Sequence, residues 1–397
     1  MDSIFVKAGF EAYRLALAVA VAFAVAYVAC LILWFAQHQW ILDEHGQPIF
    51  TDFVALWTSG RMALHGAALQ AYDGHALHAA EVAAIGHGVK GYLGWPYPPM
   101  FLFVVAALGT LPYATAFLAW EAATLALYAG TVSAISGARN AILFACVAPW
   151  VAADLSTGQN GFLTASLIGA VLLTMETRPV ASGIFLGLLT YKPQFGILFP
   201  FVLVADGRWR VLVSASITAV ILALLAGEVF GFDTFMAFLH GLPQTTRTLV
   251  VEGSVGWNKL QSFYGLTRWL EGGDLAARLV QACVSIACLA AIVCLWRSKA
   301  SFALKAAMLA CAVLLATPYV FFYDFPVLAL AIAFLHRDRV FDALECAGLG
   351  FALACTFGFI LFTTPFAVFS VLIIFSLGVR RWLSVPKQAE HVALQRG

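Results

Sequence analysis

Asp52 is the carboxylate best placed for acid–base chemistry in this sequence. It stands at the start of a helix-like stretch, T-D-F-V-A-L-W-T-S-G-R-M-A-L, over residues 51–64. A carboxylate that faces a cavity can act as a general base and take a proton from a substrate hydroxyl. Aspartate is also a favoured N-cap, because its carboxylate accepts hydrogen bonds from free backbone N–H groups. The residues alone favour the N-cap role, and the two roles are compatible.

Lys192 is the second candidate, because it lies near the middle of the apolar run over residues 180–204. A charge in such a run indicates a functional site with an anionic partner. A lipid phosphate is the obvious anion for a lysine that faces a cavity inside a membrane. Pro193 is expected to break the helix beside it and to free backbone groups for contacts with a ligand. The alternative is a side chain that reaches out to the membrane interface.

Two uncharged polar residues lie between apolar segments in D-L-S-T-G-Q-N-G, which spans residues 154–161. Gln159 and Asn160 can each donate and accept hydrogen bonds, which suits the hydroxyl groups of a sugar. Polar residues at membrane depth are costly unless they line a wet cavity. The alternative is a turn that joins two helices at the membrane surface.

A second polar cluster follows in E-G-S-V-G-W-N-K-L-Q-S, over residues 252–262. It contains Asn258, Lys259 and Gln261, with Trp257 available as a face on which a ligand ring could stack. Arg247 lies a few residues upstream and adds a second cation. Amide groups beside cations can bind the hydroxyls and phosphate of a substrate.

An isolated carboxylate occurs near the end of a predicted span in A-T-P-Y-V-F-F-Y-D-F-P, over residues 316–326. Asp324 follows Tyr323 there. A carboxylate in an apolar setting usually needs a partner. Lys192 and Lys259 are both candidates for that partner.

Two further motifs are better explained by structure than by chemistry. Asp73, His75, His78 and Glu81 could line one helix face, and we favour the polar face of an interfacial helix over a metal site. In W-P-Y-P-P, over residues 95–99, the prolines fix the backbone and predict a rigid, extended lead into the next span.

The composition says which kind of fold must hold these residues. Of 397 residues, 62% are hydrophobic and only 11% are charged, less than half of the usual charged share in a soluble domain. This excludes a soluble enzyme, a disordered chain and a disulfide-stapled module, and it predicts a polytopic membrane protein. The net charge of +1 argues against a nucleic-acid partner.

About twelve apolar segments recur along the chain, so we predict an all-α fold with about 12 transmembrane or re-entrant helices. Several are shorter than the ~20 residues of a straight span, and broken segments over 140–204 hint at an internal cavity. The segments are 10–36, 98–111, 114–136, 140–153, 161–176, 180–204, 211–229, 276–296, 302–317, 320–336, 340–361 and 363–379.

Pairs of Lys and Arg in short loops predict the orientation, because such loops favour the cytoplasm. The pairs begin at Arg208, Arg297, Arg337 and Arg380. Both termini are then cytoplasmic, and the long loops 37–97 and 230–275 lie on the opposite face. We predict a single transmembrane domain over 1–383 and a polar cytoplasmic tail over 384–397.

These motifs in this order resemble glycosyltransferase family 87, whose members are polyprenyl-phosphate-sugar-dependent transferases of the GT-C superfamily. The resemblance covers about residues 50 to 330. It rests on the stretch from Thr51 that ends in A-Y-D at Asp73, on Y-P-P, G-Q-N-G and Y-K-P-Q, and on V-G-W-N-K-L-Q-S and A-T-P-Y-V-F-F-Y-D.

The resemblance implies a multi-pass enzyme of the bacterial inner membrane with a helical first periplasmic loop and a periplasmic active site. The donor would be a sugar on polyprenyl phosphate, often mannose, and the acceptor would be lipid-linked or a glycan. The acidic residue that serves the family as catalytic base falls on Asp52. The mannosyltransferase branch has histidine in the motif that holds Tyr323 and Asp324 here, and this difference bears on the sugar.

The predicted reaction is therefore an inverting transfer of one sugar. Asp52 takes the proton of the acceptor hydroxyl, and the cations Lys192, Lys259 and Arg247 neutralise the departing phosphate. No cofactor and no metal are expected. Sugar and acceptor would contact Gln159, Asn160, Asn258, Gln261, Tyr323 and Asp324. The alternatives are a lipid or solute transporter, although no related halves are visible, and a ligase that moves a whole lipid-linked glycan.

Overall fold

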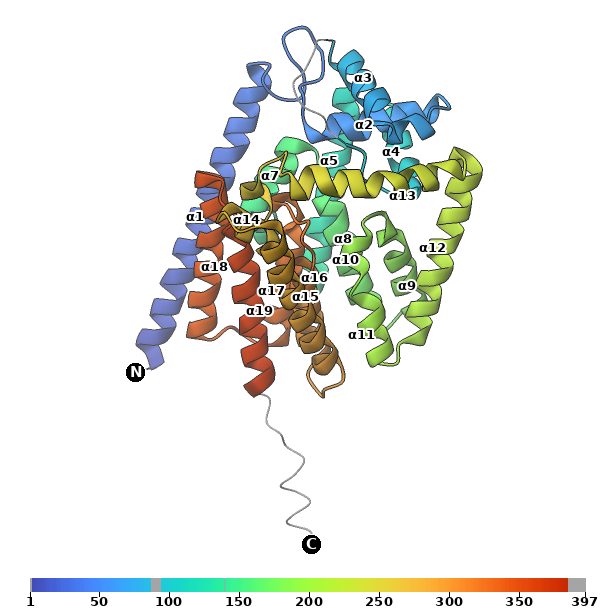
Figure 1. The fold of residues 1–397 in the computed structure, drawn as a ribbon. Helices are drawn as coiled ribbons and strands as arrows, with labels where there is room; N and C mark the ends of the chain where they lie inside the picture. Colours follow the sequence, from blue (N-terminus) through green and yellow to red (C-terminus); the bar gives the residue numbers. More distant parts are fainter. Residues whose placement is uncertain (1, 87–93, 139, 385–397) are drawn as a thin grey trace.

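Long apolar helices run side by side through the protein (Figure 1). The computed structural model describes residues 2–86, 94–138 and 140–384. In these residues five helices are long and apolar enough to cross a membrane: α5 (Tyr113–Ser136), α12 (Trp209–Phe230), α15 (Asp274–Trp296), α18 (Ala343–Phe362) and α19 (Ala367–Ser384). On α12, Val213, Ile217 and Val220 are more than half exposed. Lipid rather than water must cover such a surface, so the predicted polytopic membrane protein is confirmed.

Other helices pack around these spans. They are α1 (Asp2–Ala36), α4 (Leu102–Gly109), α6 (Ala141–Val147), α7 (Pro149–Thr157), α8 (Gly161–Thr174), α9 (Pro179–Leu188), α10 (Pro193–Gly196), α11 (Phe199–Ala205), α16 (Phe302–Ala316) and α17 (Pro326–Asp338). The described residues hold six apolar helical stretches of 10–17 residues besides the five long ones. The total of about twelve crossings therefore stays a prediction.

Proline sets several of the breaks, as expected. Pro149, Pro179, Pro193 and Pro326 each stand at the start of a helix, where the missing N–H removes no hydrogen bond. The apolar run over 180–204 is consequently not one span. It is divided into α9, α10 and α11, and Lys192 lies in the irregular backbone just before α10.

A helical layer covers one end of the bundle and is formed by the two long loops (Figure 1). The layer contains α2 (Asp52–Leu64), α3 (Gly74–Ile85), α13 (Asp233–Thr246) and α14 (Phe263–Trp269), and α13 lies across the ends of neighbouring helices. α1 begins and α19 ends at the opposite end. Short turns complete the fold: η1 (Leu69–Tyr72), η2 (Pro99–Phe101), η3 (Leu189–Tyr191), η4 (Arg247–Val251), η5 (Trp257–Lys259) and η6 (Phe322–Asp324). From residue 385 onward, the predicted tail is outside the described residues.

α2 is anchored by its aromatic side chains. The indole N–H of Trp57 donates to the carbonyl of Leu111 at 3.0 Å. The ring of Phe53 packs against Tyr113 and Phe117, with centroids 5.5 and 5.1 Å away. Interior packing of this kind leaves little freedom, so the first residue of α2 is held in place.

The helix predicted around Asp73 is α3, and Asp73 is its N-cap. Its carboxylate accepts hydrogen bonds from the backbone N–H groups of His75 and Ala76, both at 2.9 Å. The prediction that Glu81 belongs to a polar face is wrong. Glu81 is buried on the same face as Leu77 and Ile85, which stand four residues before and after it.

Candidate active site

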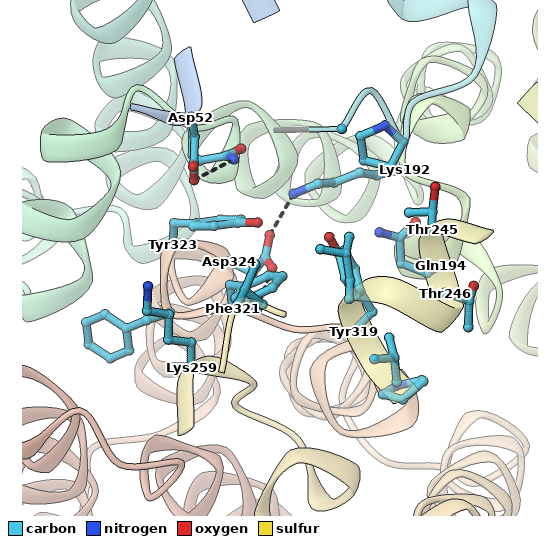
Figure 2. Close-up of a pocket in the computed structure, with 18 of the residues that line it drawn as sticks. Asp52, Lys192, Gln194, Thr245, Thr246, Lys259, Tyr319, Phe321, Tyr323 and Asp324 are labelled. Atoms are coloured by element: carbon cyan, nitrogen blue, oxygen red, sulfur yellow. Dashed lines mark hydrogen bonds and ion pairs between the residues drawn. The ribbon is translucent and has the colours of Figure 1, made fainter. Parts of the chain in front are cut away.

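A cavity of about 770 Å³ lies where the outer layer meets the membrane helices. It is lined by parts of α2, α7, α13 and α15 and by the irregular segments around Lys192 and Tyr323. Six predicted site residues line it, and Figure 2 labels five of them: Asp52, Gln159, Lys192, Lys259, Tyr323 and Asp324. Residues up to 272 positions apart are thus gathered around one space.

A buried ion pair lies at the centre of this cavity (Figure 2). The Lys192 ammonium is 2.7 Å from a carboxylate oxygen of Asp324, and both side chains are about 95% buried or more. The second oxygen of Asp324 accepts from the backbone N–H of Phe321 at 3.0 Å. The predicted partnership between Lys192 and Asp324 is confirmed, and the alternative that Lys192 reaches out to the interface is wrong. An ammonium has three N–H donors, so this pair leaves Lys192 able to bind a second anion.

Asp52 faces the same cavity from the start of α2. The N-cap of α2 is Thr51, so the prediction that Asp52 is the N-cap is wrong. The Asp52 carboxylate instead accepts a hydrogen bond from the side-chain amide of Gln159 at 3.0 Å. Burial raises the pKa of Asp52 above its ordinary value, and the Gln159 hydrogen bond and the Lys259 charge oppose that rise. A carboxylate with a raised pKa is a better proton acceptor than an ordinary one.

A chain of hydrogen bonds orients the Gln159 amide toward Asp52. The amide oxygen of Gln159 accepts from the Tyr97 hydroxyl at 3.4 Å and from the backbone N–H of Asn160 at 3.3 Å. The Asn160 side chain donates to the same Tyr97 hydroxyl at 2.8 Å. With its oxygen occupied in this way, Gln159 must present its NH₂ group to Asp52.

The predicted turn at G-Q-N-G is present, and of its two predicted contact residues Gln159 lines the cavity whereas Asn160 does not. The segment joins α7 to α8, and Gly158 has φ +72°, which favours glycine. Asn160 is fully buried and is not part of the cavity lining. Its role is to hold the Tyr97 hydroxyl in place through the hydrogen bond that it donates. Tyr97 itself lines the cavity. The sequence assigned W-P-Y-P-P to backbone geometry alone and missed this hydroxyl.

Replacing Gly161 by alanine is expected to destabilise the fold by several kcal/mol. A Cβ there would overlap the backbone carbonyl of Tyr323 and would lie 2.7 Å from the Asp154 carboxylate, so α8 would have to move. Gly130→Ala in α5 is the matched control, because its Cβ would meet no atom within 4 Å. Thermal unfolding in detergent should show a clear loss for Gly161→Ala alone, and equal midpoints would contradict this packing argument.

Three other predicted site residues do not line the cavity. Arg247 is largely exposed and pairs with Glu252 at 2.8 Å. Asn258 lines a separate shallow hollow on the outer layer. Gln261 is buried, and its amide bonds to backbone groups that include the carbonyl of Thr364 and the N–H of Ala367.

Trp257 does not offer the free stacking face that the sequence predicted. The guanidinium of Arg268 lies 4.2 Å from the centre of its ring, and its indole N–H donates to the carbonyl of Val250 at 3.0 Å. The cation therefore occupies the face on which a ligand would stack.

Residues 95–318, more than half of the chain, match the sequence model of glycosyltransferase family 87. That range contains Gln159, Lys192 and Lys259, and it ends before Asp324. No curated protein and no solved structure matches the chain.

Proposed function

The chain belongs to glycosyltransferase family 87 and is a membrane glycosyltransferase, and we propose that it moves a single sugar from a polyprenyl-phosphate donor. The sugar is mannose or another hexose or pentose, and the acceptor is lipid-linked or a glycan. Transfer takes place with inversion at the periplasmic face of a bacterial inner membrane. One observation carries this proposal: the Asp52 carboxylate and the buried Lys192 line one cavity.

Asp52 and Lys192 divide the chemistry between them. Asp52 takes the proton from the acceptor hydroxyl while that oxygen forms a bond to the anomeric carbon of the donor sugar. The bond from that carbon to the phosphate breaks, and the polyprenyl phosphate leaves with the bonding electrons. Lys192 lowers the barrier by placing an ammonium next to the departing phosphate in a setting that excludes most water.

Asp324 and Tyr323 fix the lysine for this task. The Lys192 ammonium lies 5.3 Å from the centre of the Tyr323 ring and 5.4 Å from that of Phe195. An ion pair and two aromatic contacts hold the cation before substrate arrives, so little reorganisation is needed during transfer. Tyr323 also lies between Asp52 and Asp324 in Figure 2, where a donor sugar would contact it.

Apolar residues also line the cavity and suit a prenyl chain. Leu242, Leu249, Ala282 and Phe359 all belong to its lining. Burial of such surface stabilises a bound lipid by about 25 cal/mol per Å². A donor that is anionic at one end and apolar along the rest fits both parts of the same cavity.

The cytoplasmic position of the termini is supported by the Lys/Arg pairs. The junctions α11–α12 and α15–α16 and the end of α19, which carry three of these pairs, lie at the end of the bundle away from α13 (Figure 1). Positive loops favour the cytoplasmic side, so the cavity opens on the periplasmic side in this proposal.

A donor panel tests the proposal most directly. Purified protein in proteoliposomes is given polyprenyl phosphates that carry mannose, glucose or arabinose, together with a native lipid extract as acceptor. We expect one of these donors to be consumed, with release of free polyprenyl phosphate and sugar incorporated into lipid. Movement of lipid without donor consumption would instead indicate a transporter, and a need for an oligosaccharide donor would indicate a ligase.

The pH dependence of transfer should report the environment of Asp52. Only the ionised carboxylate accepts a proton, so kcat is full above the pKa of Asp52 and is lost as pH falls through it. Because that pKa is raised, the acid limb should lie above 3.8, the ordinary value. Lys259→Met removes a charge that favours ionisation and should move the limb to higher pH.

Arg61→Gln is the control for this shift. Arg61 is on the same helix as Asp52, but it stacks on Trp57 at 4.9 Å and does not line the cavity. Its pH profile should match that of the wild type. If Lys259→Met leaves the acid limb of the kcat–pH profile unchanged, or moves it to lower pH, the electrostatic role of Lys259 is contradicted.

A further inference from the structure

One face of α13 and the turn after it points into the cavity. Leu242, Thr245, Thr246 and Leu249 all line it, and they stand at positions i, i+3, i+4 and i+7. This spacing places side chains on one side of a helix. The π turn η4 (Arg247–Val251) follows α13 directly and carries Leu249. Single π turns in α-helical segments often occur at functional sites.

Polar side chains lie at the centre of this face of α13 and beside it. In the described part of the chain, the side chains of Thr245, Thr246 and Gln194 form no hydrogen bond with any other residue. Gln194 follows Lys192 by two residues and lines the same cavity. Three side chains with free hydrogen-bonding groups therefore surround one part of the cavity next to a cation.

These three residues lie across the ion pair from the catalytic carboxylate. In Figure 2 the Lys192–Asp324 pair separates Asp52 from Gln194, Thr245 and Thr246. In an inverting displacement the attacking oxygen and the leaving group stand on opposite sides of the reacting carbon. If Asp52 marks the acceptor side, the phosphate must leave on the side of the threonines.

We propose that Thr245, Thr246 and Gln194 form, with Lys192, the binding site for the phosphate of the prenyl-linked donor. The two hydroxyls and the amide donate hydrogen bonds to phosphate oxygens, and Lys192 supplies the charge. Leu242 and Leu249 contact the first prenyl units on either side. The inference rests on the proposed function and assigns its donor site to the face of α13.

Product inhibition provides the test, because free polyprenyl phosphate has the phosphate and the chain but no sugar. The double variant Thr245→Val/Thr246→Val keeps side-chain shape and removes both hydroxyls. Hydrogen bonds to charged groups are worth about 1.5–3 kcal/mol, so its inhibition constant for polyprenyl phosphate should rise about 10-fold or more. Inhibition by polyprenol, which has no phosphate, should stay at the wild-type level.

Two variants separate hydrogen bonding from helix structure. Thr245→Ser/Thr246→Ser keeps both hydroxyls and should retain inhibition by polyprenyl phosphate. Thr248→Val is the matched control: its hydroxyl lies 3.2 Å from the Gln244 amide, and it is not part of the cavity lining. The inhibition constant of Thr248→Val for polyprenyl phosphate should equal that of the wild type.

The outcomes distinguish this inference from the function on which it rests. An active wild type, with a valine double variant inhibited as strongly as the wild type, would overturn the threonine site alone. Equal weakening of polyprenol and polyprenyl phosphate would also overturn it, because the lost contact would then be with the chain. A wild type that neither consumes prenyl-linked sugars nor responds to polyprenyl phosphate would overturn the proposed function itself.

Discussion

Asp52→Asn is expected to lower kcat by about 10²–10⁴-fold, the usual contribution of a general base. The asparagine oxygen can still accept the hydrogen bond that Gln159 donates to Asp52 at 3.0 Å, so α2 and the cavity should keep their geometry. What is lost is the ability to take a proton at neutral pH. The measurement is kcat and KM for the prenyl-linked donor with purified protein, and the loss should appear in kcat.

Asp73→Asn is the matched control for this variant. Asp73 belongs to the same outer loop, but it caps α3 and does not line the cavity. Asparagine caps helices about as well as aspartate, so both folding and transfer should persist. Transfer by Asp52→Asn at close to the wild-type rate would show that another group takes the proton.

The sequence predicted the spans and limited the partner of Asp324 to two lysines, because both features depend on strong energetic signals. A long lipid-facing helix such as α12 must be apolar over most of its length, and hydropathy reports this directly. A lysine within an apolar run requires a counter-charge, and few carboxylates are available to provide it. Asp324 is 132 residues away from Lys192, yet the scarcity of charge reduced its candidate partners to Lys192 and Lys259, and the folded chain pairs it with Lys192.

The sequence did not predict the residues that depend on three-dimensional neighbours. Tyr97, Thr245 and Thr246 are uncharged, and uncharged polar side chains need no counter-charge that would reveal their position in a sequence. The mixture of leucine and threonine on α13 indicates a binding face only when the cavity beside this helix is known. The i, i+3, i+4, i+7 spacing was the one signal that could have identified this face.

Local partners explain why two predicted ligand contacts did not reach the cavity. Arg247 pairs with Glu252 only five residues later, and the pair stays in the exposed part of the outer layer. Gln261 satisfies backbone groups where the outer layer meets the start of α19. A polar type in a motif indicates what a side chain can bind, whereas the folded chain decides what it does bind.

Removing one partner of the Lys192–Asp324 pair should have the largest effect on stability. Lys192→Met leaves the Asp324 carboxylate buried without its cation, and breaking a buried pair in this way costs about 3–5 kcal/mol. Transfer should also be lost, because no cation remains beside the departing phosphate. Denaturant unfolding in detergent and the donor assay measure the two effects separately.

The double variant Lys192→Met/Asp324→Asn separates the structural role from the catalytic one. Asparagine is neutral and can still accept from the Phe321 N–H, which now donates to Asp324 at 3.0 Å, so most of the lost stability should return. Transfer should not return, because the double variant still has no cation beside the departing phosphate. A double variant that is stable and transfers sugar at the wild-type rate would remove Lys192 from the mechanism. If Lys192→Met instead unfolds at the wild-type denaturant concentration, the Asp324 carboxylate must find another partner or a proton, and the ion pair would not hold this part of the cavity together.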